Sequence, residues 1–186
     1  MAAHPTNTIS LDRIVQRAKE IATFNTRTYS EVAHDPAALP EAAIVVATVA
    51  VAAGLGGVID GANGLLGGII LSLLGWVVTA AIVYFVGTRI TGTPTTTGSV
   101  ESILRTLGYA SGPGIFMILG FLWGIGWIFV GLVNLWTLVT TILAIRASLN
   151  LSLGRSALTG ILALVAASII RGMLAWIFGI NLFIPF

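Results

Sequence analysis

The sequence predicts an all-α membrane protein, a polytopic helical bundle with five spans, and its composition and patterning carry that prediction. Of its 186 residues, 56% are hydrophobic and 9% are charged, whereas a soluble domain carries about 25% charged residues. The mean hydropathy is +1.00. Several uncharged stretches approach or exceed the ~20 residues that a helix needs to cross a bilayer. The lipid bilayer is therefore expected to be the main surrounding of this chain.

The polar N-terminal segment is expected to be a region of its own. Residues 1–39 contain no long apolar run, so we assign them to a cytoplasmic N-terminal region and residues 40–186 to a transmembrane domain. Residues 1–9 are typical of a flexible tail. The turn-forming residues His34-Asp35-Pro36, followed by Pro40, break the helical pattern and separate the two regions.

A short amphipathic helix is expected within that N-terminal region. Ser10 is a suitable N-cap, and Asp12 lies in the first turn, where its charge complements the helix dipole. Apolar residues recur at helical spacing while charged residues take the opposite face; the apolar positions are Leu11, Ile14, Val15, Ala18, Ile21 and Ala22. Such a helix either lies on the membrane surface or packs beneath the membrane bundle.

Two uncharged segments then follow, joined by a short polar connection. Residues 42–59 are long enough to span a bilayer, and residues 65–87 form a second expected span. The DGANG sequence at 60–64 is typical of a turn, in which Asp60 is expected to be exposed. After the second span, residues 88–99 are rich in threonine, glycine and proline and are expected to form a loop.

A short interfacial helix is expected before the third span. Ser99 is a suitable N-cap for it. Glu101 and Arg105 are four residues apart, in the order that favours a helical ion pair. The apolar face comprises Val100, Ile103, Leu104 and Leu107.

The longest uncharged apolar segment covers residues 112–145. As a single helix it would reach roughly 50 Å, far beyond the ~30 Å of a hydrocarbon core. We therefore expect two spans folded at residues 124–126, the first over residues 113–124 and the second over 127–147. The first is short, so it is either a tilted crossing or a partly re-entrant helix. A fifth apolar segment covers residues 156–180.

The basic residues predict the orientation. With five crossings, eight of them fall on one side, which the positive-inside rule identifies as the cytoplasm; they are Arg13, Arg17, Lys19, Arg27, Arg89, Arg105, Arg146 and Arg155. The N-terminus is then cytoplasmic and the C-terminus external. The short loops are typical of a bacterial or archaeal cytoplasmic membrane.

The residues that usually carry chemistry are scarce. Both histidines, His4 and His34, precede the first span, and cysteine is absent, so an intramembrane haem or metal site lacks ligands. Glu41 at a helix start is explained by the helix dipole. The net charge of +2 is too small to suggest a nucleic-acid partner. We therefore expect no enzyme activity, no cofactor and no metal.

Arg171 is the one charged residue inside an apolar segment, and such a residue is a candidate functional group. It either snorkels to the outer interface or binds a lipid phosphate or a partner's carboxylate. Elsewhere, glycines four residues apart favour close helix packing within the chain or with another subunit; the pairs are Gly57 and Gly61, Gly64 and Gly68, and Gly120 and Gly124. Trp123 and Trp127 flank the expected outer turn, where an aromatic belt would lie.

The stretch TLGYASGPGIF at 106–116 predicts an elbow from the membrane surface into the membrane. Gly108 is expected to end the surface helix, because a residue free to adopt positive φ is preferred there. Tyr109 is expected at the level of the lipid headgroups. Pro113 is expected to start the next helix, where its missing N–H has no cost.

The same stretch carries a family resemblance. The sequence RTLGYASGP at 105–113, Trp136 and AIRASLNL at 144–151 resemble the Yip1 domain family in its prokaryotic form, over about residues 40–180. The resemblance implies the five-span layout. Eukaryotic members are Golgi and endoplasmic-reticulum membrane proteins that associate with one another and with prenylated Rab GTPases.

Taken with the lack of catalytic groups, the resemblance implies a non-enzymatic membrane scaffold or adaptor, such as an accessory subunit of a larger complex. A transporter or channel for a small or lipidic solute is the alternative. Candidate contacts with lipid or a partner are Arg171, Tyr109, Arg105 and Pro113.

Overall fold

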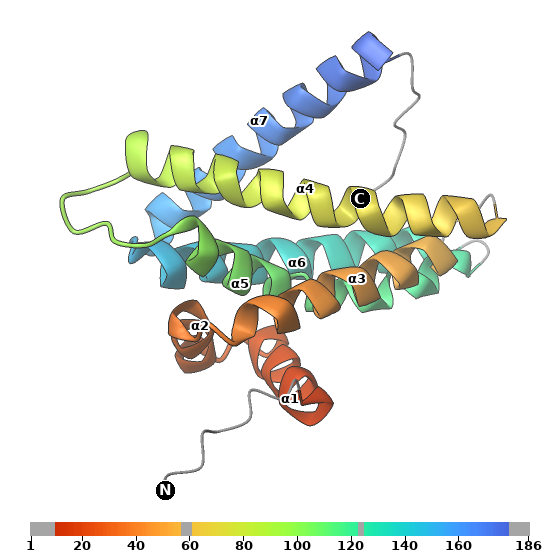
Figure 1. Ribbon diagram of the computed structural model, residues 1–186, viewed down its shortest axis with the longest axis horizontal. Coiled ribbons are helices and arrows are strands. Elements are labelled where there is room, and N and C mark those ends of the chain that lie inside the picture. The colour runs from red at the N-terminus through yellow and green to blue at the C-terminus, as the bar shows by residue number, and fades with distance from the viewer. Residues whose placement is uncertain (1–9, 57–60, 123–124, 179–186) are drawn as a thin grey trace, which may run out of the picture.

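The computed structural model describes residues 10–56, 61–122 and 125–178, and in these ranges every regular element is a helix. Figure 1 shows α3, α4 and α6 each running roughly along the long axis, with α1 and α2 grouped on one side. The elements in chain order are α1 (Leu11–Ala22), α2 (Thr26–His34), α3 (Ala38–Gly56), α4 (Gly61–Arg89), α5 (Val100–Ala110), the 3₁₀ helix η1 (Gly112–Phe121), α6 (Gly126–Leu149) and α7 (Leu153–Phe178).

Four of the described helices, α3, α4, α6 and α7, are long and apolar enough to cross a membrane. The chain is therefore a multi-pass helical membrane protein. The remaining expected span is η1, a 3₁₀ helix of 10 residues that packs against α3 and α6. Pro113 lies in its first turn, as predicted, where no N–H is needed.

The N-terminal region contains one more helix than the sequence predicted. Helix α1 occupies the expected residues, although the Ser10 side chain makes no capping hydrogen bond. Helix α2 was not anticipated, because it is short and mostly polar. It begins where the Asn25 side chain accepts a hydrogen bond from the Arg27 N–H at 3.2 Å, and it buries Tyr29 and Val32.

The predicted turn at residues 60–64 is wrong for the part that the structure describes, because α4 begins at Gly61. A helix satisfies its own backbone hydrogen bonds, which favours its continuation wherever water is scarce, despite the glycines. Asp60 lies outside the described residues, as do His4, Gly57, Trp123 and Gly124. Trp127 is exposed at the start of α6.

Helix α5 starts as predicted, with the Ser99 hydroxyl accepting from the Ser102 N–H at 3.2 Å. It continues through Gly108 to Ala110, so the expected helix end at Gly108 is wrong. This glycine is needed for close packing instead, since a Cβ on it would lie 2.7 Å from the Cβ of Ala42 on α3. The residue therefore sets how closely α5 approaches α3.

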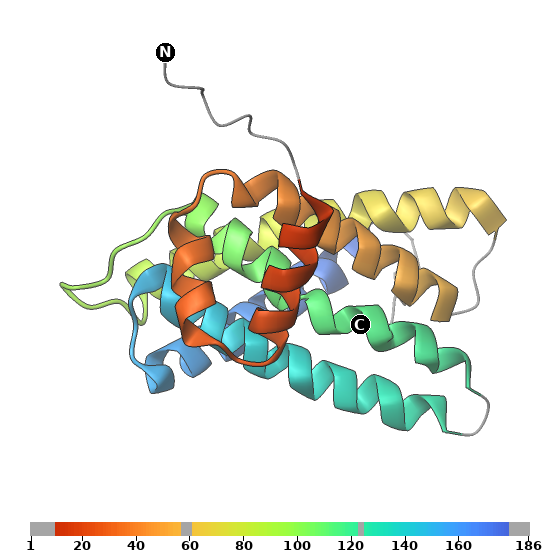
Figure 2. The same ribbon diagram turned by 90° about the horizontal axis from the view of Figure 1, so that it is seen from below.

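The most deeply buried side chains cluster where α1, α2 and α5 meet the ends of the long helices. We call α1, α2 and α5 together the helical cap. Figure 2 shows α1 and α2 crossing over α5 and α6. The fully buried large residues there are Ile21, Tyr29, Val32, Ile103, Tyr109, Ile145 and Leu149. Along α4, by contrast, only 17% of the span is buried.

Candidate functional site

A buried carboxylate lies at the centre of the helical cap. Glu41, in the first turn of α3, is fully buried. Its Oε1 accepts hydrogen bonds from Nε, at 2.7 Å, and Nη2 of Arg13. Its Oε2 accepts from Arg17 Nη1 at 3.0 Å and from the Tyr109 hydroxyl at 2.7 Å. Both carboxylate oxygens are therefore engaged by side chains from two other helices.

A second carboxylate balances the charge of this cluster. Asp35, between α2 and α3, accepts from Arg17 Nη2 at 2.7 Å and from the Ala37 N–H at 3.0 Å. Burial alone would raise the pKa of Asp35, but the hydrogen bonds from Arg17 and Ala37 outweigh it, so the pKa is lowered. The two arginines and two carboxylates make the cluster electrically neutral.

The position of Tyr109 at the level of the headgroups stays a prediction, while the structure shows what surrounds its side chain within the protein. Its ring is fully buried and its hydroxyl points at Glu41. Burial raises the pKa of this phenol, and the neighbouring Glu41 carboxylate raises it further. A buried tyrosine needs a hydrogen-bond partner, and Glu41 provides one that lies 68 positions away in the sequence.

Arg105 also has a different partner from the expected one. It donates from Nη1 to the backbone oxygen of Ala33 at 2.7 Å, and among the described residues no Glu101–Arg105 ion pair is found. Ala33 is in the last turn of α2, where carbonyl groups lack helical partners and a cation is favourable. Arg105 thus holds the C-terminal end of α2 against α5.

Two tryptophans and a threonine connect the cap in the same way. The indole N–H of Trp136 donates to the Ala22 carbonyl at the end of α1 at 2.8 Å, and that of Trp76 donates to the Leu104 carbonyl at 3.0 Å. The hydroxyl of Thr140 donates to the Ala110 carbonyl at 2.7 Å. Trp136 and Thr140 therefore satisfy the carbonyls at the C-terminal ends of α1 and α5, whereas Trp76 reaches a carbonyl inside α5.

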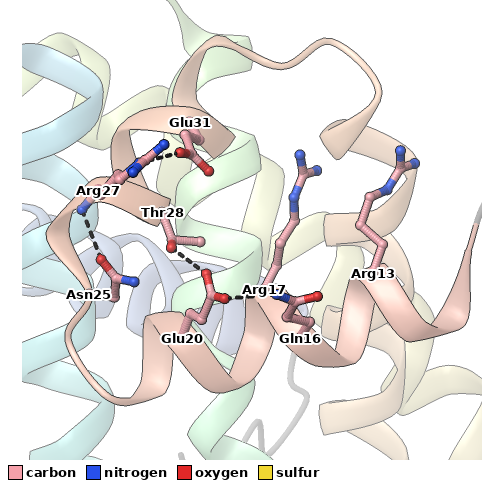
Figure 3. Close-up of a pocket in the computed structure, with 8 residues that line it drawn as sticks. All are labelled: Arg13, Gln16, Arg17, Glu20, Asn25, Arg27, Thr28 and Glu31. Carbon is pink, nitrogen blue, oxygen red and sulfur yellow. Dashed lines mark hydrogen bonds and ion pairs between the residues drawn. The ribbon is translucent and has the colours of Figure 1, made fainter.

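A polar groove lies between α1 and α2 on the outer side of the cluster, with a volume of about 350 Å³. Figure 3 shows Arg27 paired with Glu31 and Glu20 hydrogen-bonded to Thr28 and Gln16. Each charged group that lines this groove therefore bonds to another side chain of the groove or to Glu41 and Asp35.

Of the remaining predicted site residues, Pro113 starts η1 and Arg171 lies in α7. The side chain of Arg171 lies outside what the structure describes. His34 is exposed, with Nδ1 2.8 Å from the Ser30 carbonyl oxygen. In the described part of the chain, no group of three histidine, cysteine or acidic residues could hold a metal ion.

Sequence reasoning did not predict that Glu41, Arg13 and Arg17 form one cluster. The helix dipole accounts for an acid in a first turn but not for its complete burial. One signal was present: Glu41 is the only charged residue between Pro36 and Asp60, in a chain with few charges. A buried charge needs a partner, and the arginines of the preceding helix were the nearest cations in the sequence.

Comparison with known proteins agrees with this architecture. The family model for the Yip1 domain matches residues 19–178. The match begins inside α1 and includes α2, so it reaches further toward the N-terminus than the resemblance over about residues 40–180. Neither the curated proteins nor the solved structures contain a match. Because the family model covers most of the chain, this protein belongs to the Yip1 domain family.

Proposed function

We propose that this Yip1 domain protein is a non-enzymatic membrane scaffold or adaptor that works as an accessory subunit of a larger complex. The carrying observation is an exposed seam on α4 made of Gly68, Leu71, Gly75 and Val78. These residues are spaced by three, four and three positions, the spacing with which one helix packs along another.

The seam has room for a second helix. A Cβ placed on Gly68 or on Gly75 would meet no atom within 4 Å, and Leu71 and Val78 are exposed. In a bilayer, helices gain little from burying apolar surface, so small residues that allow close backbone approach favour association. The glycines of this seam therefore support contact with a second copy or with another membrane subunit.

The cluster around Glu41 supports a structural role for the polar groups. Its carboxylate already accepts hydrogen bonds from Arg13, Arg17 and Tyr109, which leaves no lone pair directed at a substrate. Asp35 is likewise engaged by Arg17 and by a backbone N–H. We infer that these charges hold the cap on the bundle.

The seam can be tested with two adjacent valines. Val77 and Val78 are 47% and 46% exposed, but only Val78 is on the seam. In this cysteine-free chain, a Val78→Cys variant in native membranes should form a disulfide-linked dimer if a second copy covers the seam. If another subunit covers it, a photoreactive maleimide attached to the same cysteine should form a discrete adduct with that one membrane protein. Val77→Cys is the matched control. Equal adduct formation at both positions, or lipid adducts alone, would contradict the proposal.

We also propose that η1 completes a fifth crossing, with the N-terminus in the cytoplasm of a bacterial or archaeal cell. Ten residues of 3₁₀ helix reach about 20 Å, enough only where the bilayer is thin. Arg155 Nη1, in the first turn of α7, donates to the Thr91 carbonyl at 2.7 Å, so the start of α7 and the end of α4 at Arg89 meet at one end of the bundle. That pairing supports a common, positively charged side.

A single cysteine at the exposed Ile125 distinguishes a crossing from a re-entrant helix. An impermeant maleimide added outside intact cells should label Ile125→Cys and should leave Ser152→Cys unlabelled until the cells are opened. Labelling of Ser152→Cys from outside would show that the proposed orientation is wrong. An Ile125 cysteine that reacts only in opened cells would show that η1 does not cross.

A further inference from the structure

Helix α1 carries one apolar stripe that is only half covered by protein. Leu11, Val15, Ala18 and Ala22 are spaced by four, three and four positions, which places them on one face of the helix. Ile14 and Ile21, on the neighbouring face, are buried in the bundle. The stripe is therefore the outer edge of the apolar side of α1.

The C-terminal half of this stripe packs on the membrane helices. The Ala18 Cβ lies 3.9 Å from the position that a Cβ on Gly112 would take. The Ala22 carbonyl accepts a hydrogen bond from Trp136. The N-terminal half continues beyond these contacts, with Leu11 70% exposed and Val15 50% exposed.

The rotation of α1 about its axis is set by the opposite side of the helix. Arg13 and Arg17 are bound to Glu41, which belongs to the first membrane span. Turning Leu11 and Val15 into the bundle would break both ion pairs and leave Glu41 as a buried, unpaired charge, which is costly. The exposed half of the stripe is therefore held outward.

The surface that continues from the stripe is aromatic and partly exposed. Trp136, which binds Ala22, stacks on Phe116 with ring centroids 5.8 Å apart, and Phe116 is exposed on η1 between two spans. Lys19 is exposed four positions after Val15, and a lysine there can extend to an anionic headgroup. Apolar residues flanked by a cation are typical of a helix in the plane of a bilayer interface.

We propose that Leu11 and Val15 of α1 insert into the leaflet on the side of the helical cap, so that α1 is an in-plane anchor bonded to the bundle through Glu41. The occupant of the exposed stripe is thus lipid. This inference goes beyond the scaffold role and does not depend on the α4 seam.

The test compares two labelled positions in the full-length protein. Val15→Cys and Gln16→Cys are each labelled with an environment-sensitive fluorophore and reconstituted into phosphatidylethanolamine–phosphatidylglycerol vesicles that contain acyl-chain nitroxide lipids. Both residues are exposed, and the Gln16 change removes one exposed hydrogen bond, to Glu20. Because Val15 faces the acyl chains and Gln16 faces water, quenching should be at least about threefold stronger at Val15.

Quenching at Val15 that equals or falls below that at Gln16 would overturn the proposal. Weak quenching together with a Val15→Cys disulfide dimer would show that a second copy covers the stripe, which also overturns it. Unfolding midpoints of both labelled proteins should match that of the unlabelled chain. The Val77 and Val78 cross-linking pattern should be unaffected by the outcome, so the two proposals fail separately.

Discussion

The helical cap is held by polar bonds between side chains, whereas the exposed length of α4 is apolar and has little protein packed against it. The cap joins α1, α2 and α5 to the long helices through named polar partners around Glu41. Helix α4 presents Leu71, Gly75 and Val78 to its surroundings with little protein against them. In a chain with 9% charged residues, the buried carboxylate of Glu41 and its two arginines thus lie in the cap. This difference predicts that conservative substitutions lower the free energy of unfolding when they are made in the cap and change it little when they are made on α4.

The largest effect is expected at the centre of the cluster. Glu41→Gln keeps the shape but removes the charge that pairs with Arg13 and Arg17. Breaking such a pair from one side should lower the free energy of unfolding by about 3 kcal/mol. Thermal unfolding in detergent measures this loss of stability, and Glu101→Gln, at an exposed position, is the control. Equal midpoints for the two variants would show that the cluster does not hold the cap.

The next effect concerns the hydroxyl that reaches the same carboxylate. Tyr109→Phe leaves the ring in place and removes the donor to Glu41. A hydrogen bond to a charged group contributes about 1.5–3 kcal/mol, and a loss in that range is expected. The matched control is Tyr84→Phe, on the exposed face of α4, which should change the midpoint little. A similar loss of unfolding free energy in both variants would contradict the proposed difference between the cap and α4.

Glycines give a third comparison, based on space alone. Gly108→Ala would place a Cβ 2.7 Å from the Cβ of Ala42, so α5 must move away from α3. Overpacking of this kind costs about 1–3 kcal/mol. At Gly75 a Cβ meets nothing within 4 Å, so Gly75→Ala should be neutral or stabilising by up to ~1 kcal/mol through helix propensity. Chemical denaturation measures the free energy of unfolding, which should fall for Gly108→Ala and should stay equal or rise for Gly75→Ala.

The smallest effect is a dependence on pH. The pKa of Asp35 is lowered in the folded protein, so its contribution is fully present above the unfolded value near 3.8. It is lost as the pH falls through the lowered folded pKa. Because the pair with Arg17 is partly exposed, the contribution should be below about 1 kcal/mol. Unfolding midpoints between neutral pH and acid should therefore fall less steeply for Asp35→Asn than for the unchanged chain.

Much of the fold was predictable because hydrophobic periodicity and length are local properties. The four long helices, the break near residue 125, the Ser99 cap and the start of η1 at Pro113 all follow from residues close in sequence. Helix α2 was missed because it is short and mostly polar. The helical start at Gly61 was missed because composition alone favoured a turn.

The candidate site was less predictable because its bonds join distant residues. RTLGYASGP was recognised as the distinctive stretch, but its partners are the Ala33 carbonyl, Ala42 and Glu41, all more than 60 positions earlier. No local sequence pattern indicates that Arg105 binds the C-terminal end of α2 instead of forming an ion pair with Glu101. Likewise, no local pattern places the Tyr109 hydroxyl against Glu41, which lies 68 positions away.

By itself, the sequence determined the class of the molecule, its long helices and its Yip1 resemblance, because hydropathy and helix breakers act over a few turns of chain. Only the tertiary structure decided that Glu41, Tyr109 and Arg13 meet, and that Gly108 sets a helix spacing rather than a helix end. The physical reason is that a charge in a nearly uncharged bundle must find its partner wherever folding brings one, however far along the chain that partner lies.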